Sequence, residues 1–226
     1  MYAIIGAMDE EVEAIRHRMN DINEETKGPV HFYRGTLNGR EIVLFKSGIA
    51  LSMAAMSTAI ALVSYSIEGI INIGTAGGLA SDIDVLDQVI GTRVTYHDLD
   101  ISAFGNPRDF SEGNRYVFTS DEHLLSIAKT LIKDHVKIGP MVSGQQFISE
   151  PKQVHDIQCH YPEALCIEME AASIAHVAHE FAVPFIVLRS ISDHVLHPEN
   201  HLDFDTYLRK ASERSAQLCF EFMGKV

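Results

Sequence analysis

The chain alternates between short apolar runs and segments in which apolar residues recur at helical spacing. Runs rich in Ile and Val, several of them continuously apolar, predict strands that are covered on both faces. The predicted strands are Tyr2–Gly6, Val30–Tyr33, Glu41–Ser47, Gly69–Ile73, Gln88–Tyr96, Ile138–Ser143, Leu165–Ile167 and Pro184–Ile191. The amphipathic pattern predicts helices over about residues 9–20, 50–66, 121–133, 151–159, 170–181 and 203–222, with Asp121 capping the third and Asp203 the last.

This alternation predicts a fold of the α/β class, with a mostly parallel or mixed sheet flanked by helices. The 226 residues contain no repeat, low-complexity segment or Pro/Gly/Ser-rich linker, so we expect one domain over residues 1–226. The longest stretch without periodicity is Asp98–Asn114. Long irregular loops in compact domains are often lids or binding loops, which makes this stretch a candidate for either.

The charge balance narrows the class of partner. With 18 Lys and Arg against 31 Asp and Glu, the formal net charge is −13 at pH 7. Such a chain offers no obvious basic face for phosphates, so we expect no nucleic acid partner and simply an acidic, solvated surface. An acidic envelope also disfavours highly anionic substrates, although a local site can override the net field.

The cysteines and the N-terminal sequence bear on the compartment. Cys159, Cys166 and Cys219 are widely spaced and include no CxxC pair, a pattern typical of reduced thiols in the cytosol. The sequence MYAIIGAMDEEVEAI begins with a short apolar run that acidic residues soon interrupt, and it shows neither a basic leader nor a small-residue cleavage site. We therefore expect a cytoplasmic protein with no membrane partner.

Four segments place polar or small residues where a buried strand is predicted to end: YAIIGAMDEE, IINIGTAGG, CIEMEAA and FIVLRSISDH. In open α/β sheets, ligands bind outside the carboxyl ends of the strands. The residues expected to converge on one pocket are Glu10, Glu11, Thr75, Gly77, Gly78, Glu168, Glu170, Arg189, Ser192 and Asp193. Taken singly, each of these strand ends could instead be a turn followed by a helix cap.

Histidines raise the alternative of a metal-binding or non-catalytic nucleoside-binding protein. The two groups are His176, His179 and Glu180 on one predicted helix, and His194, His197 and His201 after Asp193. A spacing of three can place two imidazoles on one helix face. Neither group forms a recognised zinc pattern such as HExxH, so we expect solvated or capping histidines and no metal.

The motifs of these segments make the chain similar to a known family. They occur in order and nearly span the chain: IIGAMDEEV, KSGI, INIGTAGGL, YHDLDISAFG, VSGQQFI, IEMEAASIAH, VPFIVLRSISD and HLDFDTYL. In this arrangement the chain resembles the 5′-methylthioadenosine/S-adenosylhomocysteine nucleosidases of the nucleoside phosphorylase superfamily. The resemblance implies a single-domain three-layer α/β sandwich with a mixed central sheet. It also implies hydrolysis of the N-glycosidic bond of these adenine nucleosides, with 5′-deoxyadenosine as a further candidate, in methionine salvage and without a cofactor.

Such a reaction calls for two carboxyl groups. Adenine leaves more readily when its N7 is protonated, and a water must attack the anomeric carbon from the opposite side. By resemblance, Asp193 is the acid at N7, oriented by Ser192, and Glu11 is the base that activates the water. Asp193 must then stay protonated near neutral pH, which burial favours. From the residues alone, Asp193 could instead cap a helix or turn, and Glu11 could serve only the helix macrodipole.

Other residues that match the family would hold the sugar. Glu170 matches the residue that grips the ribose hydroxyls, and Met169 beside it can pack on the sugar face. Glu168 is expected near this cluster. Because two ionised carboxylates so close together would repel each other, at least one should be neutralised or hydrogen-bonded, and Arg189 is a possible partner.

The remaining matches surround the base and the 5′ group. Phe147 would stack on adenine and the backbone of Ile148 would read its Watson–Crick edge, although both could be plain core residues. The other expected pocket positions are Ile49, Thr75, Gly77 and Phe204, of which the apolar ones would line the 5′-thioether channel. The resemblance also implies a homodimer in which residues 98–114, and Phe104 to Phe110 in particular, lie near the partner's active site.

The nearest alternative is a purine nucleoside phosphorylase on the same fold, in which phosphate replaces water as the nucleophile. Binding a dianion calls for Arg and for the amides of a glycine loop. Here the N-terminal loop reads GAMDEEV, and INIGTAGG carries no Arg. Three adjacent acids, Asp9, Glu10 and Glu11, would repel phosphate but suit the activation of water.

The chain departs from the usual family pattern at several places. The common SGIGK reads SGIALSM here, which removes a Gly and a Lys, and Gln145 in SGQQF replaces the usual Asp. The loop NPRDFSEGN differs from the common YEYGQ-type sequence, and HVLHPENH is about one residue longer than usual. These changes concern the 5′ pocket and its surroundings, so they leave open which 5′-substituted adenosine is preferred.

Overall fold

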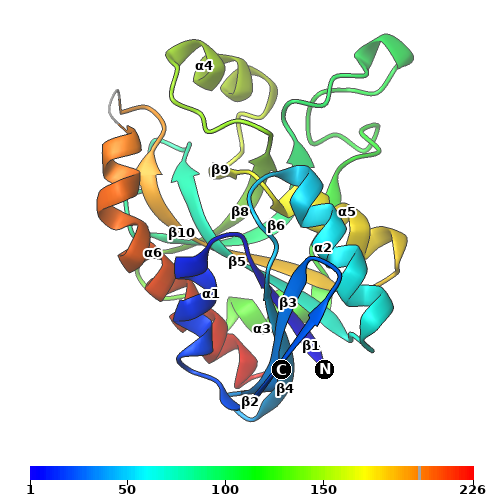
Figure 1. The fold of residues 1–226 in the computed structure, drawn as a ribbon. Helices are drawn as coiled ribbons and strands as arrows, with labels where there is room; N and C mark the ends of the chain where they lie inside the picture. Colours follow the sequence, from blue (N-terminus) through cyan, green and yellow to red (C-terminus); the bar gives the residue numbers. More distant parts are fainter. Residues whose placement is uncertain (198–199) are drawn as a thin grey trace.

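The fold is that of a computed structural model, which describes residues 1–197 and 200–226 (Figure 1). Its strands are β1 (Tyr2–Gly6), β2 (Asn20–Lys27), β3 (Val30–Leu37), β4 (Arg40–Lys46), β5 (Gly69–Gly78), β6 (Gln88–Tyr96), β7 (Phe118–Thr119), β8 (Val136–Ser143), β9 (Cys166–Glu168) and β10 (Phe185–His194). Its helices are α1 (Asp9–Arg16), α2 (Leu51–Ser64), α3 (Glu122–Lys129), α4 (Pro151–His160), α5 (Ala171–Glu180) and α6 (Asn200–Met223), with a 3₁₀ turn η1 (Ser102–Phe104).

One mixed sheet runs through the molecule in the order β10-β6-β8-β9-β5-β1-β4-β3-β2, and β7 pairs with β6. Strand β1 lies parallel to both β4 and β5, whereas β2, β3 and β4 form an antiparallel meander. Strand β10 pairs in parallel with β5 and antiparallel with β6, so this part of the sheet closes on itself. The predicted α/β fold with a mixed sheet is confirmed, and the closure is an addition that we did not predict.

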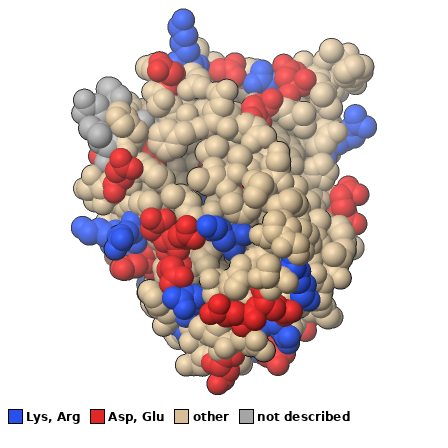
Figure 2. Space-filling model, in the orientation of Figure 1, with Lys and Arg blue, Asp and Glu red and all other residues tan. Residues whose placement is uncertain are grey.

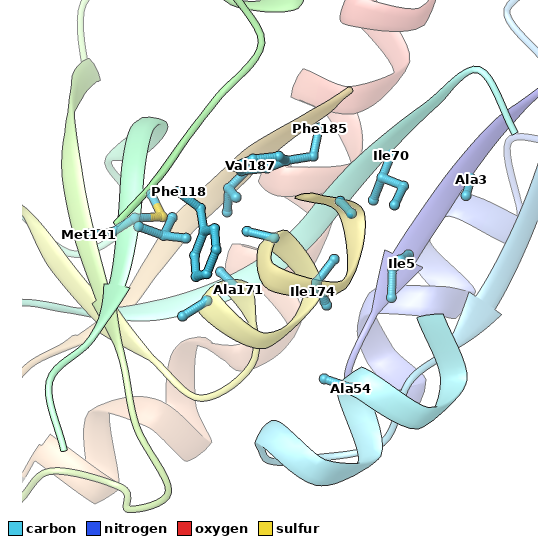
Figure 3. Packing of buried hydrophobic residues seen from close by; sticks show 14 of the residues in the cluster. Ala3, Ile5, Ala54, Ile70, Phe118, Met141, Ala171, Ile174, Phe185 and Val187 are labelled. Carbon is cyan, nitrogen blue, oxygen red and sulfur yellow. The ribbon is translucent and has the colours of Figure 1, made fainter. Parts of the chain in front are cut away.

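Alternate residues of the central strands face two opposite helix layers. Ala3 and Ile5 of β1 belong to the apolar cluster under α2 and α5, whereas Ile4 belongs to the cluster under α1, α3 and α6. Figure 3 shows part of the first cluster, which includes Ile5 of β1, Ile70 of β5 and Ile174 of α5. Each fully buried Val, Leu or Ile side chain in these clusters contributes about 1.5–3 kcal/mol, so the two clusters hold the three layers together.

The segment between β6 and β7 projects from the body of the molecule at the end where α4 lies (Figure 1). Arg108 ties this segment to α4 through an ion pair with Asp156 at 3.0 Å. Phe110 is buried against Tyr161, with ring centroids 5.4 Å apart. The expected irregular segment is therefore anchored at Arg108 and Phe110, while Phe104 in η1 remains exposed.

The first predicted helix is wrong beyond Arg16, because the chain enters strand β2 at Asn20. We did not predict β2 since its sequence, NDINEETK, has no apolar alternation and most of it is exposed. It is held by backbone pairing with β3 along one edge of the sheet. Charged side chains on such an edge strand discourage pairing with other chains.

Strands β5 and β10 are longer than predicted, since they continue through GTAGG and through SISDH. The pairing of the two strands extends to His194 opposite Gly78, with Asp193 opposite Gly77 and a register shift between Ile191 and Asp193. The polar residues expected after these strands therefore lie within them. A strand in the closed part of the sheet has neighbours on both sides, which supports it even where Gly lowers its intrinsic preference.

One of the two predicted caps is confirmed. The Asp121 carboxylate accepts a hydrogen bond from the Leu124 amide at 2.9 Å at the start of α3. Asp203 lies inside the first turn of α6, which begins at Asn200, and it pairs with His197 at 3.5 Å instead of capping the helix.

The surface matches the acidic composition. On the face shown in Figure 2, Lys and Arg side chains lie among Asp and Glu side chains and form no extended basic area. Within residues 1–197 and 200–226, none of the helices combines the length and the apolar character needed to cross a bilayer.

Candidate active site

A cavity of about 340 Å³ opens near the carboxyl ends of β1, β5, β9 and β10. Its volume is within the range of roughly 300–1,000 Å³ that is typical of small-molecule sites. The predicted site residues that line it are Glu11, Ile49, Thr75, Gly77, Phe147, Ile148, Glu168, Met169, Glu170, Ser192, Asp193 and Phe204. Residues from the beginning, middle and end of the chain thus surround one nucleoside-sized space.

Three residues expected at this pocket lie outside its lining: Glu10, Gly78 and Arg189. The lining also includes residues that we did not predict: Ala7, Met8, Ala76, Gln146, Ile167 and Val195. Ala7 and Met8 stand between a predicted strand and an acidic run, which is the position where a ligand-binding loop is expected. Their position at the end of a predicted strand could have identified them, but our prediction named only the charged residues that follow.

The Glu11 carboxylate is buried and receives hydrogen bonds from two segments. Its Oε2 atom accepts from the amides of Ala7 at 2.7 Å and Met8 at 3.1 Å. Its Oε1 atom accepts from the Thr75 amide at 2.8 Å and the Thr75 hydroxyl at 3.2 Å. The first pair shows that Glu11 does serve the start of α1, as the alternative interpretation held. The second pair ties it to β5 and holds it at the cavity wall.

Gly74 makes room for this arrangement. A Cβ atom at this position would lie 2.2 Å from Nη1 of Arg189 and 2.7 Å from Oε1 of Glu11, and the φ angle of 151° is one that L side chains rarely adopt. Gly77 likewise leaves room for Val195 and Asp193, because a Cβ there would lie 2.8 Å from Cγ1 of Val195 and 3.2 Å from Oδ2 of Asp193. The glycines of IGTAGG therefore permit close approach of the charged side chains.

Asp193 lies on β10 directly after the register shift and is buried. The hydroxyl of Ser192 donates a hydrogen bond to Oδ1 of Asp193 at 2.8 Å. This is the contact expected if Ser192 orients the carboxyl group. Because Asp193 lies within a strand, the alternative that it caps a helix does not hold.

Arg189 lies behind the cavity and neutralises Glu168. Its guanidinium donates to Oε2 of Glu168 at 2.7 Å and to the side chain of Asn72 at 2.7 Å, and all three side chains are buried. The expected pairing of Arg189 with one of the two neighbouring glutamates is thus present. Asn72 was missed, although an Asn inside the apolar run IINIG was a visible signal.

Glu170 is buried, and among the residues that the structure describes no cation forms an ion pair with it. Its Oε1 atom accepts a hydrogen bond from the amide of Ala50 at 2.8 Å. Burial, and then repulsion by Glu168, raise the pKa of Glu170 to about 8, against smaller opposing effects from Arg189 and the Ala50 amide. This carboxyl group consequently changes protonation close to neutral pH.

The apolar side of the cavity is built from aromatic and aliphatic side chains. Phe147 is half exposed and meets Phe204 edge to face, with ring centroids 5.6 Å apart. Ile148 lines the cavity while also belonging to the core cluster under α4. The interpretation of Phe147 as a plain core residue is therefore wrong, whereas Ile148 fits both interpretations.

Of the two histidine groups, His179, His197 and His201 are exposed, whereas His176 is partly buried. His176 stacks on Phe118 at 4.8 Å and its Nδ1 atom lies 3.1 Å from the Tyr96 hydroxyl. Across the residues that the structure describes, no three His, Cys, Asp or Glu side chains are arranged to hold a metal ion. Of the segment HVLHPENH, Pro198 and Glu199 lie outside the described residues.

Comparison with known proteins agrees with this geometry. The family model described as the Phosphorylase superfamily matches residues 1–223. A 5′-methylthioadenosine/S-adenosylhomocysteine nucleosidase of Anoxybacillus flavithermus is 40% identical over 220 residues, which cover 96% of this chain and 94% of the relative.

Solved structures give the same result. The nucleosidase of this kind from Neisseria meningitidis, in complex with methylthio-immucillin-A, superposes with a TM-score of 0.94 at 35% identity and covers 100% of this chain and 99% of its own. A futalosine hydrolase of Helicobacter pylori superposes with a TM-score of 0.91 at 29% identity, covering 100% and 97%. The chain belongs to the phosphorylase superfamily and, within it, to the family of 5′-methylthioadenosine/S-adenosylhomocysteine nucleosidases.

Proposed function

We propose that this protein hydrolyses the N-glycosidic bond of 5′-methylthioadenosine and S-adenosylhomocysteine, releasing adenine and the 5-thioribose derivative. The observation that carries the proposal is that Glu11 and Asp193, two buried carboxyl groups from opposite ends of the sequence, line the same cavity. 5′-Deoxyadenosine is a further candidate, since it shares the base, the sugar and the bond. Release of these products would serve methionine salvage.

Asp193 is the acid in this mechanism. Its proton passes to N7 of adenine as the bond from C1′ to N9 breaks and the bonding electron pair leaves with the base. Ser192 supports this role because its hydroxyl fixes one oxygen of the carboxyl group. A positioned acid of this kind typically contributes about 10²–10⁴ in rate.

Glu11 is the base. A water adds to C1′ of the oxocarbenium-like sugar and gives up a proton to the Glu11 carboxylate. The hydrogen bonds from Ala7, Met8 and Thr75 hold this carboxylate in place before the reaction starts. The longest of them, from the Thr75 hydroxyl at 3.2 Å, is the one that a water can most easily share.

The other cavity residues hold the substrate. We assign Glu170 to the ribose 2′-hydroxyl, Met169 to the sugar face and Phe147 to stacking on adenine. The backbone of Ile148 would read the edge of the base. The apolar side chains Ile49 and Phe204 would line the channel for the 5′ thioether, with Thr75, Gly77 and Glu168 completing the wall.

The structure also bears on whether water or phosphate is the nucleophile. The amides of Ala7, Met8 and Thr75 could bind an anion, but the Glu11 carboxylate already accepts their hydrogen bonds. A phosphate dianion beside Glu11 would in addition be repelled, by about 1 kcal/mol per charge pair at 4 Å in water and by more in a less polar site. These contacts favour water.

The test is product analysis with and without phosphate. We expect 5′-methylthioadenosine to yield free adenine and 5-methylthioribose at a rate that added phosphate does not raise. Formation of 5-methylthioribose 1-phosphate, or a requirement for phosphate, would favour the phosphorylase instead. A panel of S-adenosylhomocysteine, 5′-deoxyadenosine and adenosine in the same assay ranks the 5′ groups.

We also propose that the protein, with residues 1–226 as one domain, acts as a homodimer in the cytoplasm. Large apolar side chains are exposed, among them Ile49 at the cavity and Met53 on α2, and Phe104 is 83% exposed on the projecting segment. Phe104 is thus the residue of 98–114 best placed to reach a partner's site, whereas Phe110 is buried in its own chain. The three free cysteines suit a reducing compartment.

A further inference from the structure

The backbone at the start of α2 is strained at Ala50. Its φ of 78° and ψ of 162° fall in a region that is essentially restricted to Gly. This chain has Ala and not Gly at this position, in SGIAL. A non-Gly residue persists in such a conformation only where its surroundings hold it there. The contacts of the Ala50 amide are therefore informative.

Two side chains from distant segments receive the first amides of this helix. The Ala50 amide donates to Oε1 of Glu170 at 2.8 Å, and the Leu51 amide donates to Oε1 of Gln145 at 3.2 Å. The α2 terminus has no side-chain cap of its own. An unpaired amide here would need another acceptor. The strained backbone is thus coupled to Glu170, which lines the cavity.

Relaxation of Ala50 to an ordinary negative φ would turn its amide away from Glu170. The carboxyl group would then lose the hydrogen bond that fixes Oε1 and with it the orientation of Oε2. The nearby charged groups do not offer a substitute donor for this hydrogen bond. Arg189 already donates to Glu168 and Asn72. The carboxylates of Glu11 and Glu168 repel the carboxylate of Glu170. The orientation of Glu170 therefore depends on the backbone of residue 50.

We propose that Ala50 is a positioning residue for substrate selectivity: its strained backbone aims the Glu170 carboxyl group at the ribose 2′-hydroxyl. This inference rests on the proposed function, since it requires Glu170 to bind that hydroxyl. It follows that residue 50 affects substrates that carry the 2′-hydroxyl and has much less effect on those that lack it. Gly should hold the arrangement without strain, while a β-branched residue, which is costlier at positive φ, should disrupt it.

The experiment compares kcat/KM for 5′-methylthioadenosine and for its 2′-deoxy analogue in the wild type, Ala50→Gly and Ala50→Val. For Ala50→Val we expect kcat/KM to fall about tenfold with the ribose substrate and to change less than about twofold with the deoxy analogue. For Ala50→Gly we expect a selectivity at least equal to that of the wild type and a higher Tm. Equal losses on both substrates in Ala50→Val would overturn the proposal.

Gln145→Ala is the matched control, because it removes the acceptor of the neighbouring Leu51 amide and leaves the Ala50–Glu170 bond in place. It should affect both substrates by the same factor. Adenine binding, which needs no ribose, reports whether each variant keeps a folded pocket. If Ala50→Val fails to fold, Ala50→Gly decides, and a selectivity below that of the wild type rejects the proposal. Absence of adenine release by the wild type would reject the proposed function itself.

Discussion

The three buried glutamates of the cavity differ in what surrounds their carboxyl groups. Glu11 accepts hydrogen bonds from three backbone amides and one hydroxyl, and Glu168 is paired with Arg189. Burial and then repulsion by Glu168 raise the pKa of Glu170 to about 8, although the Ala50 amide donates a hydrogen bond to it. The three carboxyl groups of this cavity are thus suited to different tasks. All three belong to Glu residues, so the differences come from their neighbours.

The raised pKa of Glu170 predicts a pH-dependent stability. In the unfolded chain this group titrates near its ordinary value of 4.5, whereas in the folded protein it titrates at about 8. The contribution of this protonation to the free energy of unfolding is therefore fully present below pH 4.5. It is lost as the pH rises to about 8, at up to roughly 1.4 kcal/mol per pH unit. We expect the Tm of Glu170→Gln to decline less than that of the wild type between pH 5 and 8 in thermal melts. The exposed Glu180→Gln is the control, and parallel curves for wild type and Glu170→Gln would contradict the prediction.

At this scale the sequence predicted which residues gather, but not how they are held. Glu11, Glu168 and Asp193 could be found because charged side chains follow recognisable apolar runs. Their partners include the amides of Ala7 and Ala50, and an amide is present at almost every residue. Nothing in the side-chain pattern could show which of them would face a carboxylate.

Strands β5 and β10 are the elements that position the chemistry. Thr75 and Gly77 lie within β5, and Ser192 and Asp193 lie within β10, and the parallel pairing of the two strands, with Thr75 opposite Ser190 and Gly77 opposite Asp193, restrains this region. A shift in register between these strands would move Asp193 relative to the rest of the cavity. Strands hold functional groups more precisely than loops do, which suits the proposed reaction, with an acid and a base on opposite sides of one bond.

Gly74 tests how closely this framework is packed. In Gly74→Ala the new Cβ would collide with Arg189 and Glu11, neither of which can move without breaking its hydrogen bonds. We expect unfolding free energy to fall by about 2 kcal/mol or more in denaturant melts, and kcat/KM to fall at least tenfold. Gly39→Ala is the control, since Gly39 also has a positive φ but a Cβ added there would meet no atom within 4 Å. If both variants lost equal stability and Gly74→Ala kept full activity, close packing at residue 74 would not matter.

Periodicity predicted most elements and failed where other forces decide. The apolar strands β1 and β4 and the amphipathic helices α3 and α5 lie near the predicted positions, because burial sets their pattern. Strand β2 was missed since it buries little, and β5 and β10 were cut short at glycines and polar residues. Pairing with segments distant in the sequence stabilises β2 and the ends of β5 and β10. Such pairing cannot be predicted from the local pattern of apolar residues.

The topology of the whole molecule explains how the two ends of the chain meet. Strand β5 pairs with β1 on one side and with β10 on the other. Glu11 follows β1 and Asp193 lies on β10, so the central strand brings them to the same cavity. The sequence predicted an α/β fold with a ligand at the strand ends, but the closure of the sheet depends on the pairing of β10 with two strands.

The proposed dimer gives a prediction for the projecting segment. Phe104→Ser removes a large exposed apolar side chain without disturbing the core, so the monomer should keep its Tm. In sedimentation experiments we expect the dimer of the variant to dissociate at a higher protein concentration than the wild-type dimer. We also expect the variant to lose activity with substrates that carry large 5′ groups. Val63→Ser, another exposed apolar position, shows whether any such loss is general. A wild type that is monomeric at all concentrations would contradict the dimer.

The most direct test of the two-carboxyl mechanism is the rate of adenine release from 5′-methylthioadenosine in Glu11→Gln and Asp193→Asn, measured in single turnovers. Both variants should bind adenine as the wild type does, although Glu11→Gln will lose some stability because its amide faces hydrogen-bond donors. We predict that release slows by at least about 10² in each variant, since each removes one proton transfer at the same bond. Release at a near-normal rate in either variant would show that the two carboxyl groups do not act together on the glycosidic bond.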